Sequence, residues 1–320
     1  MTASNIINQH IAICVCTHSR PQYLTRLLVA LQDIDLSGYN PQSVEIIIVD
    51  NNPNPETEAI CRRAAPRVPI PIHYTTEPEA GITFARNRAI AVALERGAEY
   101  ISFVDDDDEP QSDWLIQLLD RQAITEADVV FGTWSLDTDM PQWARESGVA
   151  RSPVKARQKI KSHRYGLPGC ASTCNVLIGR SILQQVAANG DIFSHNFRNS
   201  GGEDKDFFIR AQDLGAGLAS ADMSVIKRIH EPERYTVRGL LKRGFKSGCS
   251  QVIMARTHGG RKQVLRLLGV ALLKLSMSLL LMPFFVFSRG LFMHSLSRMA
   301  RAVGILFSML TGHSLKYYSR

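Results

Sequence analysis

Short apolar stretches alternate with amphipathic ones along the first two-thirds of the chain. Stretches rich in β-branched or aromatic residues predict strands over 11–17, 44–49, 72–75, 100–104, 129–132 and 218–226. Apolar residues at helical spacing predict helices over 21–31, 55–65, 83–96, 114–121 and 203–215. Strands that alternate with helices at this spacing indicate an α/β fold, with a mostly parallel sheet flanked by helices.

The last third of the chain has a different pattern. Residues 264–288 contain long apolar stretches with Lys274 inside, and a membrane span needs about 20 apolar residues. Residues 290–312 form a better amphipathic helix, because Arg298 and Arg301 share one face. A membrane span, an amphipathic pair lying in the interface and a basic helical cap on a soluble core all remain open.

Composition and charge narrow the class of protein. The chain has 320 residues, of which 45% are hydrophobic and 21% charged, an ordinary globular composition. Its six cysteines show no C-x-x-C spacing, and its first residues do not resemble a signal peptide. From Tyr235 to Arg320 there are 14 Lys and Arg but no Asp or Glu. This asymmetry predicts a polyanion or a membrane surface as partner of the C-terminal part.

Polar clusters follow three of the predicted strands: Thr17 to Arg20, Asp50 to Asn52, and Asp105 to Asp108. Ligands of open α/β sheets bind beyond the carboxyl ends of the strands. Four consecutive carboxylates after a buried strand are costly unless a cation neutralises them, and hard oxygen ligands favour Mg²⁺ or Mn²⁺. The alternative is an acidic first turn of the helix that begins near Trp114.

Several other polar residues have a chemical and a purely structural interpretation. Asp50 and Asn51 suit a base or ribose, or a local turn. Arg86 suits a phosphate, or an ion pair with the acidic cluster. Gly201-Gly202-Glu203-Asp204 suits a carboxylate that takes a proton from a sugar hydroxyl, or a helix N-cap. His230 suits a phosphate or metal, or an ordinary surface position.

Taken together and in order, these segments resemble the family-2 inverting glycosyltransferases with the GT-A fold. The matching stretches are Ile13–Pro21, Ile46–Asn52, Gly81–Asn87, Phe103–Asp108 and Gly202–Phe207. More narrowly, Gly201–Phe208, Ile229–Pro232 and Leu241–Gly248 resemble the bacterial succinoglycan-type exopolysaccharide glucosyltransferases. Members of that group extend a lipid-diphosphate-linked oligosaccharide at the cytoplasmic face of the inner membrane.

The resemblance implies a role for each candidate residue. Arg86 is implied near the diphosphate of the donor. The other residues implied around the donor nucleotide are Thr17, Arg20, Asp50, Asn51, Asp105, Asp106 and His230. Asp105 and Asp107 are the outer acids of an Asp-x-Asp motif, with Asp107 as the direct metal ligand. Asp106 or Asp108 takes part if the register shifts by one residue. Asp204 is implied as the general base, with Glu203 beside the acceptor.

The implied activity is an inverting transfer, dependent on Mn²⁺ or Mg²⁺, from a nucleotide-sugar such as UDP-glucose to a lipid-linked glycan. The transferase domain is expected over residues 1–250 and a membrane-associating region over 251–320. The alternative is a non-catalytic, membrane-tethered module that binds nucleotide-sugars or glycans. A nucleic-acid binder is disfavoured, because the basic tail lacks base-stacking aromatics interleaved with its charges.

Overall fold

The computed structural model describes residues 9–136, 141–146, 167, 171–198, 200–229, 232–285 and 287–312. The chain divides into two compact units. The first unit comprises Met1–Ser135, Ser152–His195 and Glu203–Ile229. The second comprises Leu136–Arg151, Asn196–Gly202 and His230–Arg320.

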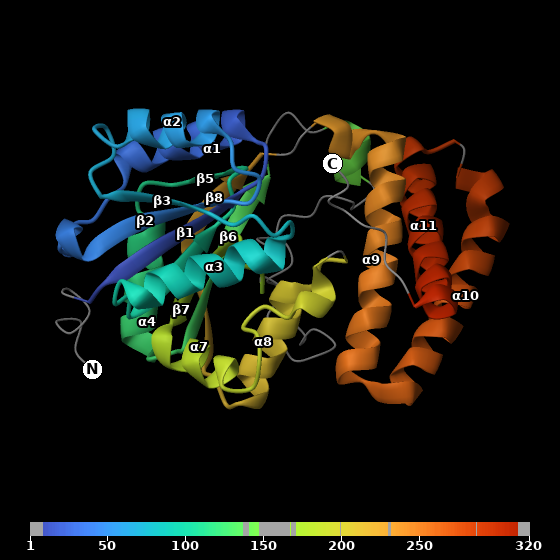
Figure 1. Ribbon diagram of the computed structural model, residues 1–320. Coiled ribbons are helices and arrows are strands. Elements are labelled where there is room, and N and C mark those ends of the chain that lie inside the picture. Colours follow the sequence, from blue (N-terminus) through green and yellow to red (C-terminus); the bar gives the residue numbers. More distant parts are fainter. Residues whose placement is uncertain are drawn as a thin grey trace. The chain divides into compact units, whose positions relative to one another are not determined.

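The first unit is built on a sheet with the strand order β3-β2-β1-β4-β7-β6-β8-β5 (Figure 1). Its strands are β1 (Ile11–Thr17), β2 (Val44–Asp50), β3 (Ile72–Thr76), β4 (Tyr100–Val104), β5 (Asp108–Pro110), β6 (Val129–Leu136), β7 (Asn175–Gly179) and β8 (Leu218–Arg228). β1 pairs in parallel with β2 and β4, and β2 with β3. β7 is antiparallel to β4 and β6, and β5 is antiparallel to β8. The predicted α/β fold is confirmed, with a mixed sheet in which the expected parallel pairing holds for the strands from β1 to β4.

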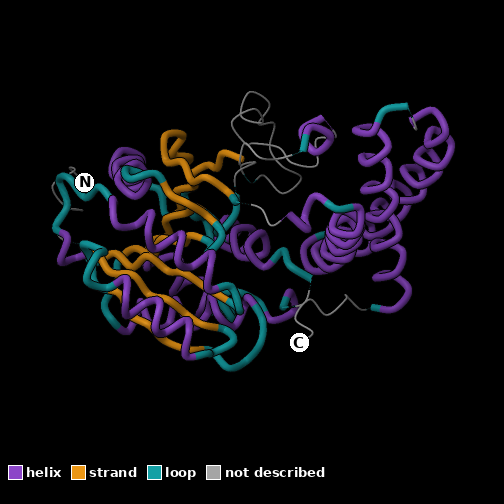
Figure 2. Tube along the Cα trace, turned by 90° about the horizontal axis from the view of Figure 1, so that it is seen from above, coloured by secondary structure: helices purple, strands orange, loops and turns teal. Residues whose placement is uncertain are grey.

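Helices cover both faces of this sheet (Figure 2). Helices α1 (Pro21–Ala30), α2 (Pro55–Ala64) and α4 (Trp114–Thr125) pack on one face, where Leu24 and Leu118 join a core with Ile11, Ile13 and Val15 of β1. On the other face lie α3 (Ile82–Glu95) and α8 (Glu203–Asp213), and α7 (Arg180–Ala187) contacts α8. Because β1 and β2 are covered on both sides, nearly all their residues are buried, as expected of parallel strands.

The register of the parallel strands gathers the predicted polar clusters at one edge. Thr17, the last residue of β1, lies opposite Asp50, the last residue of β2. Cys14 of β1 lies opposite Phe103 of β4, so β4 ends beside the end of β1. The polar residues that follow these three strands therefore share the carboxyl edge of the sheet.

The second unit is helical in its described part, with α5 (Gln142–Glu146), α9 (Val237–His258), α10 (Gly260–Phe285) and α11 (Arg289–Thr311). Helices α9 and α11 approach closely, since a Cβ on Gly248 or Gly304 would collide with backbone of the other helix. One helix among the described residues, Gly260–Phe284, is long and apolar enough to cross a membrane. Only 17% of its apolar 18-residue window is buried inside the protein. Residue 250 lies within α9, and the division into domains at that residue stays a prediction.

Candidate active site

The acidic run after β4 folds into a tight turn. The backbone N–H of Asp108 donates to the carbonyl oxygen of Asp105 at 3.2 Å. The turn brings the carboxylates of Asp105, Asp107 and Asp108 together, with one oxygen from each within 4.8 Å of the others. Helix α4 begins at Trp114 without an acid in its first turn. The alternative that the acidic run forms the start of this helix is therefore wrong.

Asp106 lies outside this group of three carboxylates. Its Oδ2 accepts a hydrogen bond from the hydroxyl of Thr17 at 2.8 Å, and its Oδ1 lies 3.5 Å from Nη1 of Arg20. Asp106 thus ties the end of β4 to the end of β1. Thr17 ends β1 and Arg20 follows it, so both lie at the carboxyl edge of the sheet, where the sequence predicts that the donor nucleotide binds. Contact of Thr17 and Arg20 with a donor stays a prediction.

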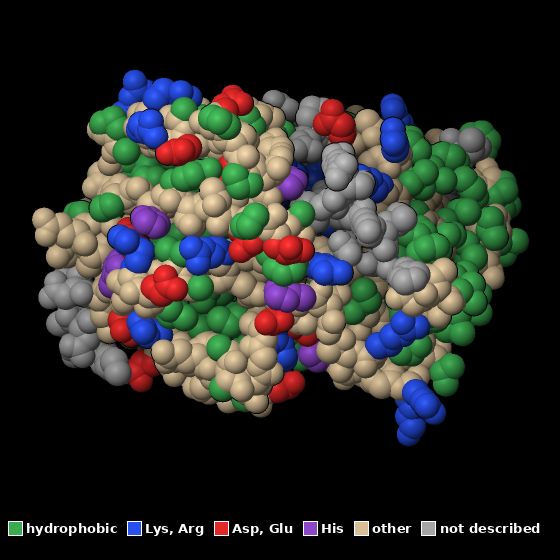
Figure 3. All heavy atoms as spheres, viewed as in Figure 1, with side chains coloured by type: hydrophobic (Ala, Val, Ile, Leu, Met, Phe, Trp, Pro, Cys, Tyr) green, Lys and Arg blue, Asp and Glu red, His purple; other side chains and the backbone are tan. Residues whose placement is uncertain are grey.

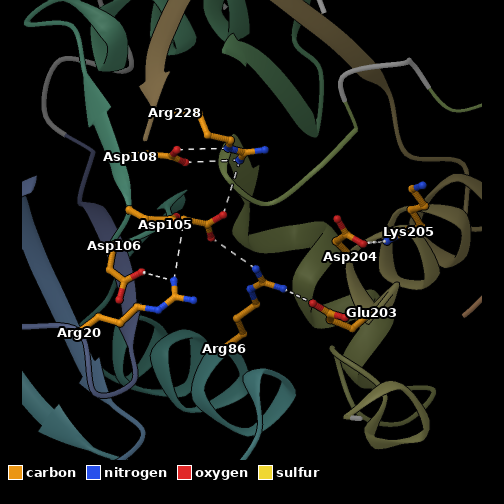
Figure 4. A network of polar contacts seen from close by, with 10 residues as sticks. Arg20, Arg86, Asp105, Asp106, Asp108, Glu203, Asp204, Lys205 and Arg228 are labelled. Carbon is orange, nitrogen blue, oxygen red and sulfur yellow. Dashed lines mark hydrogen bonds and ion pairs between the residues drawn. The ribbon is translucent and has the colours of Figure 1, made fainter. Parts of the chain in front are cut away.

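Three arginines converge on the acids (Figure 4). Arg20 follows β1, Arg86 lies on α3 and Arg228 ends β8, so three separate elements bring their charges to one place. The ion pairs are Arg20 with Asp106 and Asp107 (3.5 Å each), Arg86 with Glu203 (2.5 Å) and Asp105 (3.5 Å), and Arg228 with Asp108 (3.2 Å) and Asp105 (3.7 Å). Among the described residues of this cluster, five carboxylates face three guanidinium groups, which leaves a formal charge of two negative.

The burial of the acids makes this excess charge costly. Burial, together with the charges of its neighbours Asp107 and Asp105, raises the pKa of Asp106 to about 7, although Arg20 and the Thr17 hydroxyl oppose the shift. Burial also raises the pKa of Asp108 well above its usual range, against the effect of Arg228. Clustered carboxylate oxygens that outnumber the guanidinium groups among the described residues fit a divalent cation. The residues present therefore suit the implied Mg²⁺ or Mn²⁺.

The polar residues after β2 are held by internal hydrogen bonds. Asp50 is buried and accepts from the backbone N–H of Asn52 (3.1 Å) and the hydroxyl of Tyr74 (3.2 Å). The side chain of Asn51 donates to the carbonyl oxygens of Glu77 and Glu79 and accepts from the N–H of Gly81. Asn51 thus fixes the loop that leads into α3. Contact of Asp50 and Asn51 with a donor stays a prediction.

The two acids at the start of α8 have different surroundings. Glu203 is buried, and its Oε1 is held by Arg86. Asp204 is half-buried, and its Oδ1 accepts from the backbone N–H of Lys205 at 2.7 Å. Asp204 is therefore the more accessible carboxylate of the pair. The structural alternative for Arg86, an ion pair with the acidic cluster, is present, and its contact with a phosphate stays a prediction. His230 lies outside the described residues.

Sequence reasoning missed two residues of this site, Arg228 and Tyr74. Arg228 ends β8, where it binds Asp108 and lies over the ring of Trp134, 5.1 Å from its centroid. Tyr74 lies on β3 and reaches Asp50. Their position in the sequence could have identified them, because both residues lie near the carboxyl ends of predicted strands. Only the pairing of the strands shows which cluster each residue joins.

Comparison with known proteins identifies the family. The model of glycosyl transferase family 2 matches residues 12–187, more than half of the chain. The chain belongs to glycosyl transferase family 2. It is therefore a glycosyltransferase, and the family and the kind of enzyme predicted from the sequence are confirmed.

Individual relatives agree with this assignment. The chain is 29% identical over 261 residues to the succinoglycan biosynthesis protein ExoM of Rhizobium meliloti, which covers 79% of this chain and 78% of that protein. The mannosyltransferase PcManGT from Pyrobaculum calidifontis, solved with GDP-Man and Mn²⁺, matches with a TM-score of 0.57 and 14% identity over 96% of this chain and 76% of that one. TarS 1–349 of S. aureus, solved with UDP, gives 0.51 and 18% over 97% and 93%. At such identities the two structures establish the GT-A-type fold alone.

Proposed function

We propose that this glycosyltransferase moves a sugar, with inversion, from a nucleotide-sugar to a lipid-linked glycan in exopolysaccharide synthesis. The donor we propose is a UDP-sugar such as UDP-glucose, and the metal is Mn²⁺ or Mg²⁺. The observation that carries the proposal is the cluster of Asp105, Asp107 and Asp108 oxygens at the edge of the sheet, together with an accessible Asp204 at the start of α8. The likeness to ExoM supports the choice of pathway.

The donor side of the site consists of residues after β1, β2 and β4. We assign Asp50 to the base of the nucleotide, with Tyr74 and the Asn52 N–H fixing its carboxylate. Asp105 and Asp107 hold the metal, with Asp108 as third ligand. When bound, the ion supplies positive charge that stabilises the departing nucleoside diphosphate.

The acceptor side consists of the first turn of α8. Asp204 takes the proton of the acceptor hydroxyl while that oxygen forms a bond to the anomeric carbon. The bond from this carbon to the diphosphate oxygen breaks in the same displacement, so one base suffices and the configuration inverts. Glu203 binds Arg86 and thereby orients the start of the helix that carries Asp204. Arg86, held between Glu203 and Asp105, ties the acceptor side to the metal side.

We further propose that residues 251–320 associate with the cytoplasmic face of the inner membrane, next to a transferase domain over residues 1–250. The apolar helix Gly260–Phe284 and the absence of acidic residues after Glu233 support this assignment. An anionic leaflet attracts each nearby Lys or Arg with about 1 kcal/mol. If this region were only a basic tail in water, the exposure of an apolar helix to solvent would be unfavourable.

Transfer and donor binding test the proposal separately. Full-length protein in detergent is titrated with UDP-glucose in the presence of Mn²⁺ and again with EDTA, and transfer to lipid extracts is followed by release of UDP. Asp204→Asn should lower turnover by about 100-fold or more and leave the Kd of the donor unchanged. Asp213→Asn, at the exposed end of the same helix, is the matched control and should behave as wild type.

Two results would contradict the proposal. Full turnover of Asp204→Asn would show that Asp204 is not the base. Donor affinity that is the same with Mn²⁺ and with EDTA would exclude a metal at the acidic cluster. If UDP-glucose does not bind and another nucleotide-sugar does, only the choice of donor changes.

A further inference from the structure

A groove runs along the second unit between helices α9 and α11. Its volume is about 920 Å³. Its apolar lining comes from both helices and includes Leu241, Phe245, Leu296, Met299 and Val303. Leu241 and Val303 are 37% and 47% exposed. The groove is therefore apolar and accessible to solvent in the described part of this unit.

Helices α9 and α11, which form the walls of the groove, pack closely against each other. Gly244 and Gly248 of α9 face backbone of α11, and Gly304 of α11 faces the carbonyl group of Phe245. The ring of Phe245 lies against that of Phe307, with 5.3 Å between centroids. Because the backbones touch here, the two helices have little freedom to close over the groove.

Positive charge is concentrated at one end of the groove. Arg238 and Lys242 line it from successive turns of α9, so they lie on one face of the helix. Arg238 belongs to the first turn, which Thr236 caps and which contains no acid. The N-terminus of a helix carries a partial positive charge that favours anions. No Asp or Glu occurs after Glu233, so neither wall of the groove contains an acid.

We propose that this groove binds one molecule of an anionic phospholipid from the surrounding bilayer. The phosphate lies between Arg238 and Lys242, and a hydrocarbon chain lies on Leu241, Phe245 and Val303. The proposal deepens the proposed membrane association and rests on it. A bilayer lipid is favoured as occupant because α10 of the same unit exposes Leu272, Leu273 and Leu280, and hydrophobic side chains gather over α10 and α11 (Figure 3).

The test uses a short-chain lipid below its micelle concentration, so that no charged surface attracts the protein. Full-length protein in neutral detergent is titrated by calorimetry with dihexanoyl-phosphatidylglycerol and, separately, with dihexanoyl-phosphatidylcholine. We expect one saturable site that prefers the anionic lipid. Arg238→Gln combined with Lys242→Gln should weaken binding about tenfold or more, as expected for the loss of a hydrogen bond to a charged group.

Two further variants separate the groove from general charge. Val303→Trp fills the groove without changing its charge and should abolish binding. Arg261→Gln combined with Lys262→Gln removes the same charge from exposed residues at the start of α10 and should leave the Kd unchanged. Equal affinity for the two lipids, or an unchanged Kd in Val303→Trp, would overturn the proposal.

A competition experiment identifies the occupant. Geranylgeranyl diphosphate that displaces the phospholipid at much lower concentration would also overturn the proposal, because the groove would then prefer the lipid carrier of an acceptor. Failure of the proposed transferase function is seen separately, in the donor titration and the release of UDP. None of the groove variants changes a residue assigned to donor binding or proton transfer.

Discussion

Replacement of Arg86 by methionine tests whether the buried ion pair organises the active site. The Arg86 and Glu203 side chains are only 9% and 8% exposed and meet at 2.5 Å. Arg86→Met removes the guanidinium partner of Glu203 but fills much of the same space, so the main change is the loss of this charge–charge contact at a buried carboxylate. We expect a large decrease in the free energy of unfolding of the first unit.

The size of the decrease follows from the burial of the pair. Unit charges about 4 Å apart interact by about 4 kcal/mol at an effective dielectric constant of about 20. Removal of one partner of a buried pair costs about 3–5 kcal/mol. The second contact of Arg86, with Asp105 at 3.5 Å, adds less because that carboxylate is 36% exposed. Arg86→Met should therefore cost about 3–5 kcal/mol.

Urea unfolding followed by tryptophan fluorescence measures this cost. The chain has three tryptophans, Trp114, Trp134 and Trp143, and the first two belong to the first unit. A Trp143→Phe background confines the signal to that unit. Arg88→Met, on an exposed position of the same helix, is the control and should change the free energy of unfolding by less than about 0.5 kcal/mol.

A double-mutant cycle decides whether the pair is responsible. Adding Glu203→Leu to Arg86→Met removes the buried carboxylate that has lost its contact with Arg86 and should restore about 2 kcal/mol or more. A loss below about 1 kcal/mol in Arg86→Met, or no recovery in the double variant, would refute the buried pair as an organising contact.

Three further predictions address the metal, the donor and the helical unit. Asp107→Asn should weaken Mn²⁺ binding at least about tenfold. Asp106→Asn removes a carboxylate that lies outside the group of Asp105, Asp107 and Asp108 and should change Mn²⁺ binding by less than about threefold; calorimetry without nucleotide measures both. Tyr74→Phe should raise KM for the donor about three- to tenfold with kcat unchanged, since a hydrogen bond contributes about 0.5–1.5 kcal/mol. Gly304→Ala should destabilise the second unit by about 1–3 kcal/mol, because the new Cβ collides with the carbonyl of Phe245. Urea unfolding measures this loss through Trp143 fluorescence, in a chain in which Trp114 and Trp134 are replaced by Phe.

The sequence predicted the elements that have a strong local pattern. The apolar runs of β1 and β2 and the helical spacing of α1 and α3 give nearly the observed bounds, since buried strands and amphipathic helices leave periodic signals. The predicted helix over 83–96 ends next to Gly97, whose φ of +88° is the left-handed conformation in which many helices end. The apolar helices near the C-terminus were also predicted within a few residues.

Elements that depend on distant partners escaped prediction. β5 is only three residues long and contains Asp108, so nothing in its composition favours a strand, and its pairing with β8 creates it. β7 is antiparallel to β4, whereas the alternating pattern indicated mostly parallel pairing. Helix α9 combines glycines with basic residues, and two of the glycines, Gly244 and Gly248, are explained by the close approach of α11.

The acidic run illustrates how structure narrows a choice that sequence leaves open. Four consecutive aspartates give no register, but their arginine contacts differ. Asp108 binds Arg228 through both carboxylate oxygens, at 3.2 and 3.4 Å, and Asp106 is held by Thr17 at 2.8 Å. Between described residues, the arginine contacts of Asp105 and Asp107 are 3.5 to 3.7 Å long. A cation displaces long ion pairs more easily than short ones, so these distances favour Asp105 and Asp107 as the ligands that bind a metal first. Arg228 contacts both oxygens of Asp108, so Asp108 would have to give up part of this contact to serve as a third ligand.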